Sequence, residues 1–337
     1  MKKNKKKKTE RFTLAIATPG AVMLYAGFML LAVLTGCTAA DTDSDVSFST
    51  EEIPLHIAAA SVERNVFTRA VGETELSEGS IIGLFRRRDG NANYNLASNV
   101  PYRLTDASWE SVNPGEAIYL RTQTASLGAV YPYGGLPATG TAVKLSSCEW
   151  AAGKEVFYAP FTASFLSPIA SFTMKHVYSR VNILFKRDKD RYTGAGTVST
   201  FALAGAGIYS GALLDVTKAL NNNPFSDYES PGYTLTGFTR TASLKGEAND
   251  AGGNDKLDLL MVPASLSGKV TLIATIDGKP MTLGLDASQF GGSLQAGMRY
   301  NIIVTVRGTA LWISSIEFAG WDETPVGDGS ILDSEFE

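Results

Sequence analysis

The chain has 337 residues, of which 44% are hydrophobic and 19% charged, and its formal net charge is −4. A chain this apolar is not intrinsically disordered, and its length is sufficient for one or two domains with buried cores. Its basic residues cluster only at the extreme N-terminus, so no folded segment carries the basic patch that nucleic-acid binding requires.

Residues 1–36 predict a secretory signal. The first 11 residues hold six lysines and one arginine, and an apolar stretch follows that ends at small residues before Cys37. A basic segment, an apolar segment and a small-residue cleavage point are the three parts of a signal that is removed during export. Because this signal contains seven of the 30 basic residues and one of the 34 acidic residues, the exported chain is more acidic than the whole sequence.

The tetrapeptide Leu34-Thr35-Gly36-Cys37 resembles the lipobox of bacterial lipoproteins. The resemblance implies cleavage before Cys37 and acylation of Cys37, which would anchor the chain firmly in outer-membrane lipid. The alternative is an uncleaved transmembrane helix, since the apolar stretch approaches the roughly 20 residues of a membrane span. Cys148 is the only other cysteine, so we expect no intrachain disulfide and a small residue in or beside a strand.

Residues 38–52 are polar and acidic and show no apolar periodicity. Four acidic residues have the spacing of ligand positions 1, 3, 5 and 12 in a calcium-binding loop: Asp41, Asp43, Asp45 and Glu52. Val46 occupies the position where such a loop needs glycine, and no helical pattern flanks the segment. We therefore expect a solvated tether between the lipid and the folded part, and no metal site.

From Ile53 onward the sequence has the pattern of β-strands. Short runs rich in Val, Ile, Tyr and Phe are separated by Gly, Pro, Asn and Asp, and no long segment keeps a 3.6-residue period. Asp277-Gly278 predicts a tight hairpin turn. Many short strands with one apolar face predict an all-β fold of antiparallel sandwiches. Residues 164–171, with a proline and small residues between two strong β runs, predict the domain boundary.

The sequence contains little catalytic chemistry. His56 and His176 are the only histidines, and no metalloprotease, nucleophile-elbow or phosphate-loop motif occurs. His176 lies in an alternating run, which predicts a partly buried strand histidine. We therefore expect no enzyme and no cofactor. Two alternatives stay open: a hydrolase with an unrecognised carboxylate pair, and a lipid-anchored surface protein that binds glycans through the aromatic residues Tyr228, Tyr233 and Phe238.

Several segments in a fixed order resemble the fimbrillin-like pilins of Bacteroidales. They are the lipobox, the acidic tether, Thr68-Arg69-Ala70, GSIIGLF, a strand with Trp109, AVYPYG, FTMKHVYSRVNILF, RYNIIVTVRG and IEFAGWDE. The resemblance implies two tandem transthyretin-like antiparallel β-sandwich domains, at residues 70–167 and 168–337. It also implies a structural subunit of a surface fimbrium, or pilus, that assembles with other fimbrial subunits for adhesion.

The resemblance further implies an assembly mechanism. In fimbrillins an arginine-specific protease removes an N-terminal strand, and a strand from the next subunit fills the groove that this leaves. Here the removed part would be residues 37–69, the tether and the first strand. Cleavage would follow Arg69 and make Ala70 the new N-terminus, with Arg64 as the second choice. The same cut would detach the lipid.

Two C-terminal segments are candidates for the donor strand, residues 300–308 and residues 310–321. Residues 300–308 have the pattern of an ordinary strand of the last sheet, so residues 310–321 are the predicted donor strand. Its apolar residues would enter the groove: Leu311, Ile313, Ile316 and Phe318. Strict alternation predicts that Leu311 and Ile313 lie on one face of this strand and that the other two lie on the opposite face.

Overall fold

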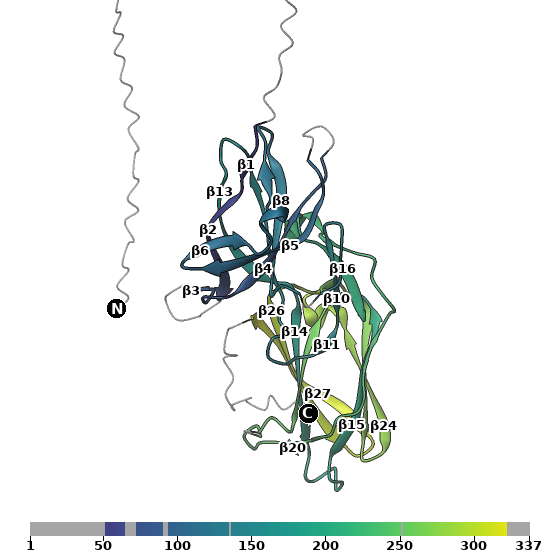
Figure 1. Ribbon diagram of the computed structural model, residues 1–337. Coiled ribbons are helices and arrows are strands. Elements are labelled where there is room, and N and C mark those ends of the chain that lie inside the picture. Colours follow the sequence, from purple (N-terminus) through teal and green to yellow (C-terminus); the bar gives the residue numbers. More distant parts are fainter. Residues whose placement is uncertain (1–50, 65–71, 90–93, 135, 251, 322–337) are drawn as a thin grey trace, which may run out of the picture. The chain divides into compact units, whose positions relative to one another are not determined.

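The computed structural model of the protein describes residues 51–64, 72–89, 94–134, 136–250 and 252–321 (Figure 1). These residues form strands and loops, with three short 3₁₀ turns at Pro114–Glu116 (η1), Leu220–Asn222 (η2) and Ala287–Phe290 (η3). None of the helical segments in these ranges is long and apolar enough to cross a membrane. The all-β fold predicted from the sequence is confirmed.

The first sheet has eight strands: β2 (His56–Arg64), β3 (Gly72–Glu75), β4 (Ile81–Arg86), β5 (Ala97–Thr105), β6 (Ser108–Ser111), β8 (Ala125–Tyr131), β12 (Phe157–Ala163) and β13 (Ile169–His176). Their order is β3-β2-β13-β12-β8-β4-β5-β6, in which only β2 and β13 are parallel. Two further short strands, β1 (Ile53–Pro54) and β7 (Tyr119–Leu120), pair with each other. Leu84, Leu127 and Met174 are among the buried residues of the first core.

The second half is a sandwich of two sheets. The six-stranded sheet contains β11 (Cys148–Glu149), β14 (Ser179–Arg187), β20 (Ser243–Leu244), β21 (Lys256–Met261), β26 (Met298–Arg307) and β27 (Ala310–Gly320). The five-stranded sheet contains β15 (Thr197–Ala206), β18 (Tyr233–Leu235), β19 (Arg240–Thr241), β23 (Ser267–Ile276) and β24 (Lys279–Asp286). Alternate residues of β14 and β26 pack against alternate residues of β15 and β23 in one buried cluster, the second core.

A four-stranded sheet connects the two halves. It contains β9 (Ala138–Thr139), β10 (Ala142–Ser146), β16 (Gly211–Asp215) and β17 (Phe225–Ser226), while β22 (Ala264–Ser265) pairs with β25 (Ser293–Leu294). Because β10 pairs with β16, strands from both sides of the predicted boundary share one sheet. β13 was expected to open the second domain but lies in the first sheet, and the next strand, β14, lies in the six-stranded sheet. The described residues belong to one compact unit, and separate folding of residues 70–167 and 168–337 stays a prediction.

The predicted Asp-Gly hairpin is confirmed. β23 and β24 form an antiparallel ladder that ends at Ile276 and Lys279, with Asp277 and Gly278 as the two-residue turn. Asp277 has a φ of 48° and Gly278 a φ of 76°, so both lie in the left-handed region that such a turn requires. The Asp277 carboxylate also accepts a hydrogen bond of 2.8 Å from the Thr197 N–H, which ties the turn to β15.

Candidate functional site

The segment that the sequence predicts to be removed contains β2, which lies inside the first sheet (Figure 1). β2 pairs with β13 on one side, from His56 opposite Ile169 to Val62 opposite Met174, and with β3 on the other side. If β2 were taken away, the facing edges of β13 and β3 would lose their backbone hydrogen-bonding partners.

The side chains of β2 and the preceding residue supply part of the first core. The contributing residues are Leu55, Ile57, Ala60 and Val62: the first three are buried, and Val62 packs against the same cluster. Their spacing departs from strict alternation because Ala58 is a bulge residue, since Ile57 pairs with Ala170 while Ala59 pairs with Ser171. Loss of β2 would therefore open an apolar groove along β13.

β13 is held weakly on its other side. Its ladder with β12 covers only two pairs, Phe157–His176 and Tyr158–Lys175, whereas β12 pairs with β8 along its whole length. A recess of 490 Å³ lies between the separated parts of β12 and β13. β2 is therefore the principal hydrogen-bonding partner of β13.

The predicted cleavage point lies partly outside the described residues. Arg64 is the last residue of β2. Arg69 and Ala70 lie outside the described residues, as do the lipidation candidate Cys37 and three candidate calcium ligands, Asp41, Asp43 and Asp45. β3 begins at Gly72, so a cut after Arg69 would remove β2 and leave β3 with the rest of the chain.

The predicted donor segment forms β27, the edge strand of the six-stranded sheet. It pairs antiparallel with β26, which lies between β14 and β27, so the other donor candidate is an interior strand. Val304 pairs with Ile313, but the preceding residue, Ile303, pairs with Ser315. Ser314 is therefore a bulge residue of β27.

This bulge corrects the expected arrangement of the candidate donor residues. Strict alternation separated Leu311 and Ile313 from Ile316 and Phe318, and that prediction is wrong because the extra residue shifts the alternation. Leu311 is buried, and Ile313 and Ile316 pack against the second core. The Phe318 ring lies 6.0 Å from the Tyr300 ring, centroid to centroid. All four side chains therefore face the same side of β27.

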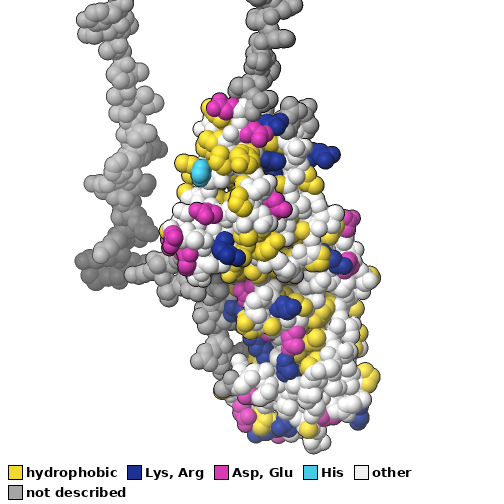
Figure 2. Space-filling view, in the orientation of Figure 1, with side chains coloured by type: hydrophobic (Ala, Val, Ile, Leu, Met, Phe, Trp, Pro, Cys, Tyr) yellow, Lys and Arg dark blue, Asp and Glu magenta, His cyan; other side chains and the backbone are white. Residues whose placement is uncertain are grey.

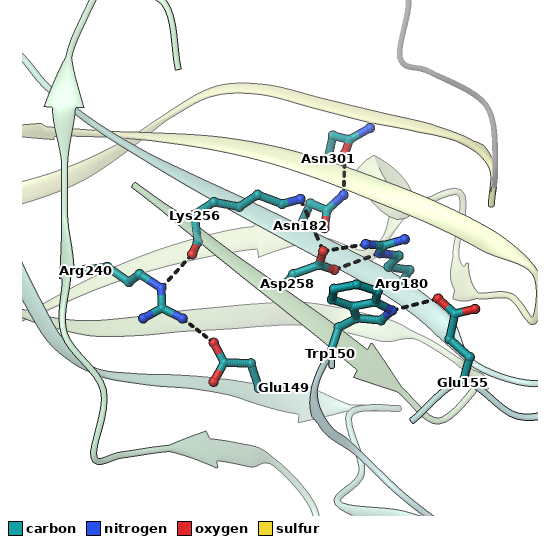
Figure 3. A network of polar contacts seen from close by, with 9 residues as sticks. All are labelled: Glu149, Trp150, Glu155, Arg180, Asn182, Arg240, Lys256, Asp258 and Asn301. Carbon is teal, nitrogen blue, oxygen red and sulfur yellow. Dashed lines mark hydrogen bonds and ion pairs between the residues drawn. The ribbon is translucent and has the colours of Figure 1, made fainter. Parts of the chain in front are cut away.

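A polar network centred on Arg180 ties β14 to β21 (Figure 3). The Arg180 guanidinium donates two hydrogen bonds to the Asp258 carboxylate, Nε–Oδ1 at 2.8 Å and Nη2–Oδ2 at 2.6 Å. Its carbon Cζ lies 4.7 Å from the centroid of the Trp150 ring and 5.7 Å from that of Trp321. Burial acts to raise the pKa of Asp258, but the hydrogen bonds and charges of Arg180 and Lys256 outweigh it and hold the pKa below its usual range.

The Asp258→Asn substitution is expected to lower the free energy of unfolding by about 3 kcal/mol at pH 7, because it removes the carboxylate that pairs with the largely buried Arg180 guanidinium. Since the folded-state pKa of Asp258 is depressed, its contribution is full above the unfolded-state pKa of about 4 and is lost as the pH falls through the folded-state value. Urea unfolding at pH 7 and at pH 3 measures the difference. The exposed Asp227→Asn is the control; an equal effect of both variants at pH 7 would contradict the assignment.

The two histidines have different environments. His176 is buried, and its ring stacks on that of Trp321 at 4.3 Å and lies tilted against that of Phe157 at 4.5 Å. It is a strand residue of β13, as predicted, but it is buried and not partly buried. His56 is exposed on β2. Cys148 lies in β11 and is half-buried, as expected for a small strand residue. Within the described ranges, no group of three or more His, Cys, Asp or Glu residues is arranged to hold a metal ion.

The three aromatic residues considered for glycan binding do not form a shared exposed surface. Tyr233 is buried, and Phe238 packs against the second core. Tyr228 stacks on Tyr209 with ring centroids 4.5 Å apart, and its hydroxyl donates a hydrogen bond to the Pro263 carbonyl oxygen. Because each of these residues has a packing role, they give no support to a glycan-binding site.

The fold and these features define an all-β sandwich protein with its N-terminal strand inside the first sheet and a bulged edge strand near the C-terminus. Residues 68–321 match the model of the fimbrillin-like family, and the chain belongs to that family. None of the curated protein sequences matches the chain significantly.

Solved structures of low sequence identity resemble this chain. A candidate cell adhesion protein from Bacteroides ovatus ATCC 8483 is 17% identical. The match covers 80% of this chain and 98% of that chain, with a TM-score of 0.51. A candidate cell adhesion protein from Bacteroides uniformis ATCC 8492 is also 17% identical, with coverages of 80% and 99% and a TM-score of 0.49. The tip fimbrial protein Mfa3 from Porphyromonas gingivalis, with C-terminal truncation, is 6% identical, with coverages of 80% and 100% and a TM-score of 0.42. The Bacteroides ovatus structure supports the fold alone.

Proposed function

We propose that the protein is a structural subunit of a surface fimbrium that polymerises by strand exchange and serves adhesion. In this proposal the chain is exported as a lipoprotein and held in the outer membrane through acylated Cys37. An arginine-specific protease then cuts after Arg69, and the freed subunit joins other fimbrial subunits. Membership of the fimbrillin-like family supports the subunit role.

The observation that carries the exchange mechanism is a match between β2 and β27. The residues on the core side of the β2 segment are Leu55, Ile57, Ala60 and Val62, and those on the core side of β27 are Leu311, Ile313, Ile316 and Phe318, of which Phe318 is half-exposed. Successive members of both sets are two, three and two residues apart. Each strand also has its bulge directly after the second member, at Ala58 and at Ser314. β27 of one subunit can therefore present the same side-chain pattern to the groove that β2 fills in another.

The match also gives the register of the exchanged strand. If β27 takes the place and direction of β2, Ser315 occupies the position of Ala59, which lies opposite Ser171 on β13. Ile316 then replaces the smaller Ala60, and Phe318 replaces Val62. The groove must widen for these larger side chains, and the short ladder between β12 and β13 leaves β13 free to move.

Strand exchange between such surfaces produces a fibre. The groove lies in the first sheet, whereas the donor is the edge strand of a different sheet. A contact between two different surfaces of identical subunits is head-to-tail, and it extends into a fibre when the rotation between subunits does not close into a ring. Backbone hydrogen bonds along β13 and β3 would supply affinity, and the four core-facing side chains would supply specificity.

The Cys37→Ala variant is expected to incorporate no radiolabelled fatty acid, because its chain lacks the thiol that is acylated. It should also be absent from the outer-membrane fraction. Labelling cells with radioactive palmitate and precipitating the protein measures acylation, and immunoblotting of the isolated outer-membrane fraction measures localisation. Cys148→Ala is the matched control, and its unprocessed precursor should keep the label, since only cleavage after Arg69 removes the lipid. Label on Cys37→Ala would contradict lipidation at this position.

A further inference from the structure

The loop between β12 and β13 is unusually apolar for an exposed hairpin connection. Residues 165–169 read FLSPI. Leu166 is 83% exposed and Ile169 is 64% exposed, the two highest values among the large hydrophobic residues that the structure describes. Connecting loops are normally polar at the surface, and clustered exposed aliphatic side chains indicate a binding partner.

Backbone hydrogen bonds place this loop beside the first described strand. The Phe165 N–H donates to the Arg121 carbonyl oxygen at 2.7 Å, and the His56 N–H donates to the Pro168 carbonyl oxygen at 3.0 Å. β1 lies next to Arg121 through its pairing with β7. Figure 2 shows hydrophobic side chains gathered at this end of the first sheet. We call this region the end surface, and its members are Ile53, Pro54, Tyr119, Leu166 and Ile169.

We propose that the end surface docks on the lipid surface to which the precursor is anchored. The proposal rests on the proposed acylation of Cys37. Fifteen residues separate Cys37 from Ile53, so even a fully extended chain holds the end surface within about 55 Å of the bilayer. Attachment at this range raises the local concentration of the end surface at the membrane, so insertion of a few aliphatic side chains is sufficient for docking.

The charges nearby point to an apolar contact with the membrane. The Arg121 guanidinium is paired with the Glu52 carboxylate at 2.7 Å, and Glu51 is also exposed here. The Arg86 guanidinium, which donates to the Tyr119 carbonyl oxygen, is a second cation here. Two arginines and two glutamates balance, so the end surface has no excess of positive charge that would select anionic lipid. Docking is therefore expected on zwitterionic lipid and is expected to be insensitive to salt.

Docking and processing are coupled by the position of the cut. Ile53 and Pro54 belong to the segment that cleavage after Arg69 would remove together with the lipid. The same step therefore dismantles part of the end surface and releases the anchor. The precursor is held at the membrane by its lipid anchor and by the end surface. The processed subunit loses the lipid anchor and part of the end surface.

The test replaces the native anchor, so that it does not depend on acylation in the cell. The unprocessed chain from Thr38 onward carries an N-terminal histidine tag that binds nickel-chelating lipid in phosphatidylcholine vesicles. In a Cys148→Ser background, Ser167→Cys carries an environment-sensitive fluorophore on the loop, and Trp312→Cys carries it on exposed β27 as the control. Brominated phosphatidylcholine should quench the label at residue 167 and leave the label at residue 312 bright.

Adding Leu166→Ser and Ile169→Ser should abolish the quenching at residue 167, whereas the exposed Val112→Ser should leave it unchanged. High salt should also leave it unchanged. Absent quenching at residue 167, or equal quenching at both labels, would overturn the proposal. An emission shift that depends on protein concentration without vesicles would show that a second copy covers the end surface instead. Lipidation itself is tested independently, by the palmitate labelling of the Cys37→Ala variant.

Discussion

Arg69→Ala protein is expected to keep its N-terminal segment and to form no fibres. Without the cut, β2 stays paired with β13 and β3, and its core-facing side chains continue to fill the groove. A donor strand would have to displace a covalently attached strand whose local concentration is far higher than that of any second subunit. Immunoblotting of surface protein measures the length of the chain, and electron microscopy of the same cells measures the fibres.

Two further variants test the cleavage point. Arg69→Lys shows whether the protease requires arginine or only a positive charge, and Arg64→Ala shows which of the two arginines is cut. Arg69→Lys keeps a positive charge but should also block an arginine-specific protease. Arg64→Ala should be processed normally, because Arg64 is the last residue of β2 and the proposed cut follows Arg69. Normal processing of Arg69→Ala together with a block in Arg64→Ala would move the cleavage point to Arg64. Fibres from a variant that keeps its N-terminal segment would contradict strand exchange at this groove.

Cysteines at Ser171 and Ser315 are expected to join neighbouring subunits by a disulfide in the assembled fibre. In the proposed register Ser315 lies directly opposite Ser171, at the roughly 4.8 Å strand spacing that a disulfide spans. The double variant Ser171→Cys, Ser315→Cys in a Cys148→Ser background should run as a ladder of multimers on non-reducing gels. Reduction should return nearly all of the protein to the monomer position.

The matched control moves one cysteine by two residues. Thr173→Cys with Ser315→Cys displaces the acceptor position by roughly 7 Å along β13, which is too far for a disulfide. A ladder from this control and none from the first pair would place β27 in a different register. The cross-link keeps β27 intact, which matters because deletion of β27 would remove Leu311 from the second core and expose β26.

The sequence predicts the parts of this fold that depend on local chemistry. The β23–β24 hairpin follows from Asp277-Gly278, because few other residue pairs accept the backbone of that turn. The place of His176 on a strand follows from its position in an alternating run. Membership of the fimbrillin-like family could also be predicted from the sequence. The segments that carry the resemblance lie largely within residues 68–321, which match the family model.

Features that depend on a partner strand could not be predicted. The bulges at Ala58 and Ser314 arise from how each strand pairs with its neighbour, and no glycine marks either position. Strict alternation therefore divided the β27 side chains wrongly between two faces. The place of β13 in the first sheet depends in the same way on its parallel pairing with β2, which is distant in the sequence. The spacing shared by β2 and β27 becomes visible only when both bulges are known.

The mass of the N-terminal peptide of the surface-exposed protein tests the central claim most directly. Protein sheared from the cell surface and digested with chymotrypsin, which does not cut after arginine, should give an N-terminal peptide that begins at Ala70 and carries no lipid. That result would mean that the β2 segment has been removed and that the groove along β13 is available to a donor strand. An N-terminal peptide that begins at acylated Cys37 in assembled fibres would contradict the account, because β2 would then still occupy the groove.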